Sequence, residues 1–279
     1  MKRIELKHIP LRREGRLGRL IRAVPLVVLA LFVLQFAMLM TWPWLPFRSG
    51  EPRWPEASFL GLALLSTLMS LARQVPGQNV LWTAVLLFII STGVESLNVL
   101  AGVPFGPLVY QVRLGAQLFH LVPWPVPFVW SVLILSSRGT ARLVLRPWRT
   151  RANYGFWVIG LTTALILLMY AGLEPVAIHV EHFWVWKPTR LPGTWYGAPW
   201  VSFLGRGVTL LIVLVFLTPL WLNKKPVPLP PDYYPLVTWS LLCVWLAVAT
   251  SRNNCPVAAV LLAVAIVPIA ALALKPRNI

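Results

Sequence analysis

The chain has 279 residues, of which 58% are hydrophobic and only 12% are charged, and its mean hydropathy is +0.72. About a quarter of the residues of a soluble domain are charged, so this composition excludes an ordinary soluble protein and indicates an integral membrane protein. The net charge of +17 does not indicate nucleic-acid binding, because the basic residues lie between apolar segments, as topology signals do. We therefore expect no nucleic-acid partner.

The first part of the chain is strongly basic. Residues 1–23 contain eight Lys and Arg, and the apolar run that follows is long enough to span a membrane. No small-residue cleavage site ends this run, so we expect a retained helix rather than a signal peptide. The basic segment is predicted to lie on the anionic cytoplasmic surface of the membrane. Residues 24–274 are predicted to form a single transmembrane domain, and residues 275–279 a cytoplasmic tail.

The apolar segments predict an all-α fold, a polytopic membrane bundle of about eight transmembrane helices, since one span needs about 20 mostly apolar residues. The candidate spans are residues 24–46, 58–74, 79–101, 117–136, 154–172, 200–222, 234–250 and 256–274. The fourth span contains Pro123, Pro125 and Pro127, so we expect it to be kinked or partly re-entrant.

The basic residues between the spans predict the orientation of the bundle. If the N-terminus lies inside, the inner segments contain 18 Lys and Arg, whereas the outer segments contain 6. Cytoplasmic segments of membrane proteins carry such an excess of positive charge. The distribution therefore predicts an even number of spans with both termini in the cytoplasm.

Two acidic residues lie at the ends of apolar segments, although the chain has only eight acidic residues in all. Glu95 lies six residues before the outer end of the third span, whereas Glu174 lies just beyond the outer end of the fifth. Arg206 lies six residues into the sixth span, which enters from the same side. An ionisable group at membrane depth is costly and indicates a functional site by default. We expect these three residues to share the outer half of the membrane, with Glu95 and Arg206 as neighbours.

Each of the two candidate catalytic acids could instead have a purely structural role. Glu95 is a candidate general acid, because apolar surroundings favour the neutral carboxyl group, but it could instead be an ion-pair partner for Arg206 or Arg113. Asn98 lies on the same helical face as Glu95, three residues farther along. Glu174 is a candidate catalytic partner or a solvated helix end.

The outer loop between the fifth and sixth spans is rich in aromatic residues. They are Trp184, Trp186, Trp195, Tyr196 and Trp200. These residues form either an aromatic belt at the membrane surface or the lining of a site for a flat polyene, where they would also stabilise a carbocation. Two histidines in this loop have the spacing of metal ligands, but no third ligand motif accompanies them, so we expect no metal site.

Two blocks of motifs surround the candidate acids. The first block consists of Glu95, Gly-Val-Pro-Phe-Gly at 102–106, Tyr110, Leu-Gly at 114–115, Val-Pro at 122–123 and Trp130. The second block consists of Glu-Pro-Val-Ala at 174–177, Trp-Val-Trp at 184–186, Tyr-Gly-Ala-Pro at 196–199, Ser202-Phe203 and Gly205-Arg206. Taken in chain order, these motifs resemble the carotenoid biosynthesis hydratases, a family of membrane enzymes from bacteria and archaea. The resemblance covers residues 60–222.

The chain departs from the family pattern at several positions of the presumed site. Glu174 stands where the family usually has Asp, and Ser202 and Arg206 stand where it has Asn and Trp. Of a tyrosine-rich stretch in the first block, this chain keeps only Tyr110.

The resemblance implies hydration of the terminal 1,2 double bond of an acyclic carotenoid, without a cofactor. An acid protonates C2, a tertiary cation forms at C1, and water adds there. By this resemblance Glu95 is the expected acid and Glu174 orients the water, or the two roles are exchanged. The expected substrate-binding residues are Asn98, Phe105, Tyr110, Trp184, Trp186, Trp195, Tyr196 and Arg206. The implied partners are membrane lipid and a carotenoid substrate or pigment, in the cell (inner) membrane of a prokaryote.

Two other functions are compatible with the sequence. One is a non-catalytic membrane subunit that binds a carotenoid or lipid within a pigment–protein complex, which the departures at Ser202 and Arg206 favour. The other is a small proton-coupled transporter that uses Glu95, although the chain shows no internal repeat of the kind that many transporters contain.

Overall fold

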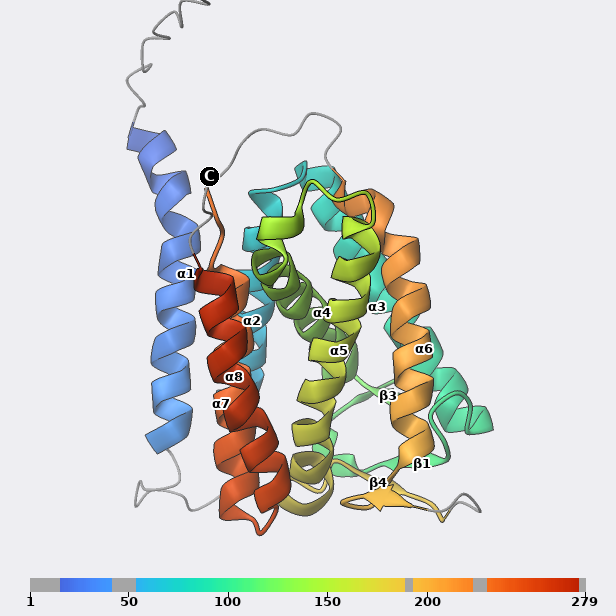
Figure 1. Cartoon of the computed structure of the whole chain (residues 1–279). Coiled ribbons are helices and arrows are strands. Elements are labelled where there is room, and N and C mark those ends of the chain that lie inside the picture. Colours follow the sequence, from blue (N-terminus) through green and yellow to red (C-terminus); the bar gives the residue numbers. More distant parts are fainter. Residues whose placement is uncertain (1–15, 42–53, 189–192, 223–229, 276–279) are drawn as a thin grey trace, which may run out of the picture.

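The computed structural model describes residues 16–41, 54–188, 193–222 and 230–275, and this part of the chain contains eight long helices that form one bundle (Figure 1). They are α1 (Arg16–Thr41), α2 (Trp54–Ala72), α3 (Gly77–Ala101), α4 (Pro125–Val144), α5 (Tyr154–Pro175), α6 (Trp200–Leu217), α7 (Tyr234–Arg252) and α8 (Pro256–Leu274). All except α4 are long and apolar enough to cross a membrane. The prediction of an all-α polytopic helix bundle is confirmed.

The predicted terminal segments lie mostly outside the described residues. Because α1 begins at Arg16, the end of the basic segment predicted for residues 1–23 is already helical. Of the predicted tail at 275–279, only Lys275 is described. The first turn of α1 and the last turn of α8 lie at the same end of the bundle (Figure 1), as an even number of spans requires.

α4 is enclosed by other helices and packs against α2, α3, α5, α7 and α8. Most of its residues are buried, among them Ser136, Ser137, Arg138 and Thr140. Polar side chains are tolerated in membrane helices where they face protein rather than lipid. This position explains why α4 is less hydropathic than the helices around it.

The predicted fourth span, residues 117–136, was wrong in its start, in its end and in the effect of its prolines, because α4 continues to Val144. Residues 117–123 form a hairpin of β2 (Gln117–Leu118) and β3 (Val122–Pro123), and α4 begins only at Pro125. Pro125 and Pro127 therefore lie in the first turn of α4, where a helix does not need their missing N–H groups. The prolines start the helix instead of kinking it.

Short strands connect the two loops that carry the sequence motifs. β1 (Leu108–Tyr110) pairs antiparallel with β4 (Trp184–Trp186), and β5 (Thr194–Trp195) pairs with β6 (Ala198–Pro199). β1 and β4 lie at the end of the bundle opposite the first turn of α1 (Figure 1). Single turns of 3₁₀ helix occupy Val112–Leu114, Arg146–Trp148 and Thr218–Trp221, and a π-helical turn occupies Val176–Val180.

A glycine on α6 allows the turn at residues 102–106 to approach this helix closely. A Cβ atom at Gly205 would lie 2.2 Å from the carbonyl oxygen of Pro104 and 3.4 Å from the ring of Phe105. Any larger side chain would push the turn away from α6. Because Arg206 is the next residue, this contact sets the position of an ionisable side chain as well.

We predict that Gly205→Ala destabilises the protein by about 1–3 kcal/mol, the usual range for overpacking. The matched control is Gly93→Ala, because nothing lies within 4 Å of an added Cβ there. This control should be neutral or stabilising, since Ala favours a helix over Gly by about 1 kcal/mol. Thermal unfolding of both purified variants in detergent measures the difference, and equal midpoints would contradict the close approach at Gly205.

The orientation predicted from the basic residues can be tested at two exposed positions. We expect a cysteine at Lys187, beside β4, to react with a membrane-impermeant thiol reagent in intact cells. A cysteine at Arg151, between α4 and α5, should react only after the membrane is permeabilised. The native Cys243 and Cys255 are buried and should contribute little background. The reverse labelling pattern would show that the bundle is inverted.

Candidate functional site

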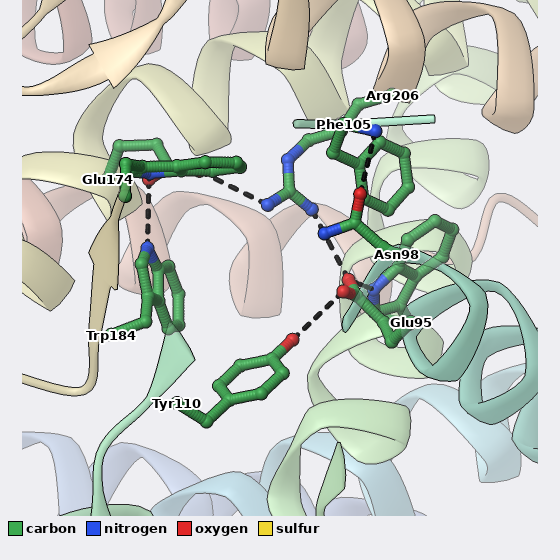
Figure 2. Close-up of polar contacts among 9 residues, drawn as sticks. Glu95, Asn98, Phe105, Tyr110, Glu174, Trp184 and Arg206 are labelled. Atoms are coloured by element: carbon green, nitrogen blue, oxygen red, sulfur yellow. Dashed lines mark hydrogen bonds and ion pairs between the residues drawn. The ribbon is translucent and has the colours of Figure 1, made fainter. Parts of the chain in front are cut away.

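Arg206 lies between the two acids at membrane depth and makes an ion pair with each (Figure 2). Its Nη1 atom is 3.4 Å from Glu95 Oε1, and its Nη2 atom is 3.2 Å from Glu174 Oε1. The exposed fractions are 3% for Arg206, 1% for Glu95 and 0% for Glu174. The prediction that Glu95 and Arg206 are neighbours is confirmed, and α3, α5 and α6 meet at this cluster.

Glu95 accepts two further hydrogen bonds. Tyr110 on β1 donates its hydroxyl to Oε2 at 2.9 Å, and Trp130 on α4 donates its indole N–H to Oε1 at 2.9 Å. Burial and the carboxylate of Glu95 raise the pKa of Tyr110, so its hydroxyl remains a donor. Within the described chain Oε1 accepts bonds from two residues and Oε2 from one, so Oε2 keeps a free lone pair.

Glu174 accepts hydrogen bonds from two tryptophans of one strand. The indole nitrogens of Trp184 and Trp186 both lie 3.0 Å from Oε2, and Figure 2 shows the contact of Trp184. Side chains two residues apart on a strand point to the same face, which explains why the Trp-Val-Trp motif delivers both indoles to one carboxylate. The π-helical turn at Val176–Val180 carries the chain from Glu174 to this strand.

Aromatic rings cover the guanidinium of Arg206. Its Cζ atom lies 4.2 Å from the ring centroid of Tyr170 and 4.6 Å from that of Phe105. Such cation–π contacts stabilise a desolvated cation. Tyr170 was not among the predicted site residues, although it lies one helical turn before Glu174, and helical spacing would have identified it. Trp130 belonged to the motif but had no predicted role.

Asn98 supports the turn that carries Phe105. Its Oδ1 atom accepts the backbone N–H of Phe105 at 2.8 Å. Its Nδ2 atom, together with Ser202 Oγ and Arg206 Nε, is buried and has no hydrogen-bond partner among the described residues. Ser202 and Arg206 lie on the same face of α6, one turn apart.

A largely apolar cavity of about 320 Å³ lies beside the ion-pair cluster. The residues of the cluster region that line it are Glu95, Tyr110, Trp130, Tyr170, Trp184 and Arg206. Most of the remaining wall consists of aliphatic and aromatic side chains from α2, α4, α5 and α7, with the charged residues Glu56, Arg113 and Glu181 as exceptions. Glu174 does not line this cavity, so only Glu95 of the two paired acids reaches it.

The predicted substrate-binding residues fall into three groups. Tyr110, Trp184 and Arg206 line the cavity. Phe105, Asn98 and Trp186 lie behind this lining and contact Arg206, the 102–106 turn and Glu174 respectively.

Trp195 and Tyr196 lie at the β5–β6 hairpin, outside the cavity lining. Trp195 donates its indole N–H to the carbonyl oxygen of Ala171 at 2.8 Å, and the carbonyl oxygen of Tyr196 lies 3.0 Å from the ring of His179. The hydroxyl of Tyr196 also accepts the backbone N–H of Val257 on α8 at 3.3 Å, and the ring of Trp195 packs against that of Trp200 on α6. Their contacts are therefore with the ends of α5, α6 and α8.

Comparisons with known proteins give the family of the chain. The family model described as carotenoid biosynthesis protein matches residues 53–270, which include both acids and Arg206. The bisanhydrobacterioruberin hydratase of Haloarcula japonica is 31% identical over 121 residues, 43% of this chain. The match spans only 39% of that relative's length. No solved structure matches the chain. Because the family model covers most of its length, the chain belongs to the carotenoid biosynthesis protein family.

Proposed function

We propose that this protein hydrates the terminal 1,2 double bond of an acyclic carotenoid. The observation that carries the proposal is the position of Glu95, a buried carboxyl group that reaches an apolar cavity lined by aromatic rings. Membership of a carotenoid biosynthesis family and the similarity to a hydratase support it. An apolar cavity suits a hydrocarbon end group, and addition of water needs no redox cofactor.

The charge of the cluster suits it to donate a proton. Glu95, Glu174 and Arg206 carry two negative charges and one positive charge when all are ionised, so one bound proton makes the cluster neutral. A neutral cluster is favoured where there is little water to solvate an excess charge. We assign this proton to Glu95 Oε2, which faces only one hydrogen-bond donor and belongs to the acid that lines the cavity.

In the proposed reaction, Glu95 Oε2 gives its proton to C2 while the double bond supplies the electron pair for the new C–H bond. The resulting tertiary cation at C1 lies beside a cluster that now carries one net negative charge. The aromatic residues Tyr110, Trp130 and Trp184 line the same cavity, and aromatic rings beside a cation stabilise it. The oxygen of water then bonds to C1, and its surplus proton returns to Glu95, so the net change is addition of one water.

Glu174 acts through Arg206 in this scheme, as a positioning residue. It does not line the cavity, and it accepts bonds from Arg206 and two indoles. It therefore fixes the guanidinium that pairs with Glu95. Water would enter along the polar part of the cavity wall, where Arg113 is exposed and Glu56 and Glu181 are half-buried.

We predict that Glu95→Gln lowers hydration by about 10²–10⁴-fold, the usual contribution of a positioned general acid. The amide still accepts hydrogen bonds but has no proton to donate as an acid, so the amount of protein in the membrane should change little. Glu174→Gln should also lower hydration, because an ionised Glu95 and Arg206 then already form a neutral pair, and the charge balance no longer favours a proton on Glu95. The measurement is the mass and chromatography of pigments in a lycopene-producing bacterial host.

Near-normal hydrated product from Glu95→Gln, with a severe loss in Glu174→Gln, would transfer the acid role to Glu174. Normal product from both single variants and the double variant would end the two-acid mechanism. If the unmodified protein retains a carotenoid on purification but forms no hydrated product, the protein is a carotenoid-binding subunit instead.

A second prediction compares Tyr110 and Tyr196, which the sequence analysis predicted alike as substrate-binding residues. Tyr110→Phe removes the hydroxyl that donates to Glu95 Oε2. It should lower hydration about tenfold or more, because this hydrogen bond stabilises the carboxylate that forms when Glu95 gives its proton to the substrate. Tyr196→Phe is the matched control, because Tyr196 lies outside the cavity lining, and it should leave the product yield near normal. Equal losses in the two variants would refute the assignment of the cavity as the site.

A further inference from the structure

A second cavity, of about 410 Å³, lies at the end of the bundle away from the Glu95 cluster. It is formed where α4 ends, α5 begins and α6 ends, at the end of the bundle opposite β1 and β4 (Figure 1). Four arginines line it, which are Arg138, Arg142, Arg146 and Arg149. The predicted orientation places this cavity at the cytoplasmic surface.

The one carboxylate in the described lining is already paired outside the cavity. Asp232 accepts the hydroxyl of Ser70 at 2.8 Å and lies 3.6 Å from Arg73 Nη1, and neither partner lines the cavity. Arg142 donates to the side-chain oxygen of Gln74, and Arg146 donates to the carbonyl oxygen of Lys275 at 3.1 Å. These acceptors are uncharged, so the positive charge in the cavity is not neutralised by the described lining.

The surroundings of Arg138 are the strongest evidence that this cavity binds an anion. It is 8% exposed, and its Cζ atom lies 4.3 Å from the ring centroid of Trp221. Within the described chain it has no carboxylate partner and no hydrogen-bond acceptor. Arg142 lies one helical turn away, and like charges at this spacing repel each other. A buried guanidinium is costly without a partner, and an anion in the cavity would supply one.

We propose that this cavity binds a phosphate-bearing anion through Arg138, Arg142 and Arg149. The planar guanidinium group matches two phosphate oxygens at once, and several guanidinium groups favour a multiply charged anion. Basic pockets between membrane helices on the cytoplasmic side bind the headgroups of anionic lipids. The phosphate of a membrane phospholipid and a soluble diphosphate offer the same chemistry, and the experiment below separates these two sources.

The test measures binding to the purified full-length protein in detergent by the rise in its thermal midpoint with ligand concentration. The probes are phosphatidylglycerol, inorganic diphosphate and, as a zwitterionic control, phosphatidylcholine. Arg149→Gln and Arg151→Gln form a matched pair, because both residues are exposed in one loop but only Arg149 lines the cavity. We expect Arg149→Gln and Arg138→Gln to weaken binding about tenfold or more, and Arg151→Gln to leave it unchanged.

Stabilisation by phosphatidylglycerol alone would identify a lipid headgroup as the ligand, whereas stabilisation by diphosphate would identify a soluble anion. Stabilisation by neither probe would overturn the proposal, as would equal effects of phosphatidylglycerol and phosphatidylcholine without any effect of diphosphate. Equal weakening in Arg149→Gln and Arg151→Gln would show an effect of surface charge and would also overturn it. If Arg138→Gln does not fold, this pair still decides the outcome.

Discussion

A guanidinium group buried in a membrane protein needs anionic partners, and Arg206 obtains them from two different helices. Glu95 on α3 and Glu174 at the end of α5 both lie within ion-pair distance of it. Each carboxylate also accepts hydrogen bonds from aromatic side chains, Glu95 from Tyr110 and Trp130 and Glu174 from the two tryptophans of β4. The meeting of three helices and two loops therefore follows from the need to compensate one buried charge.

The two ends of the bundle carry opposite imbalances of charge. The cluster around Arg206 has one more carboxylate than guanidinium groups, whereas the cavity at the other end has arginines without carboxylate partners among the described lining residues. α4 contributes to both, through Trp130 near its start and Arg138 near its end. Because other helices enclose α4, it can carry these polar contacts without exposing them to lipid.

The ion-pair cluster shows what the three departures from the expected pattern, Glu174, Ser202 and Arg206, do physically. A tryptophan at position 206 would supply one neutral donor, whereas Arg206 supplies a positive charge and contacts both carboxylates. Glu174 has one more methylene group than the aspartate that the sequence resemblance predicts at this position. Ser202, one turn before Arg206, leaves its hydroxyl without a partner in the described chain. The chain thus combines two acids with a cation at a position where the sequence resemblance predicts an aromatic ring.

The sequence by itself determined the helical membrane bundle and the juxtaposition of Glu95 with Arg206, because hydropathy and the cost of charges in apolar segments are local properties of the chain. It did not determine which aromatic residues line the cavity beside Glu95. Trp184 reaches the cavity and Trp195 does not, although both belong to the same loop. That difference depends on the pairing of β1 with β4 and on the π-helical turn after Glu174, which are contacts between distant segments. Only the tertiary structure decides such contacts, because residue type and spacing within one loop do not specify its partner.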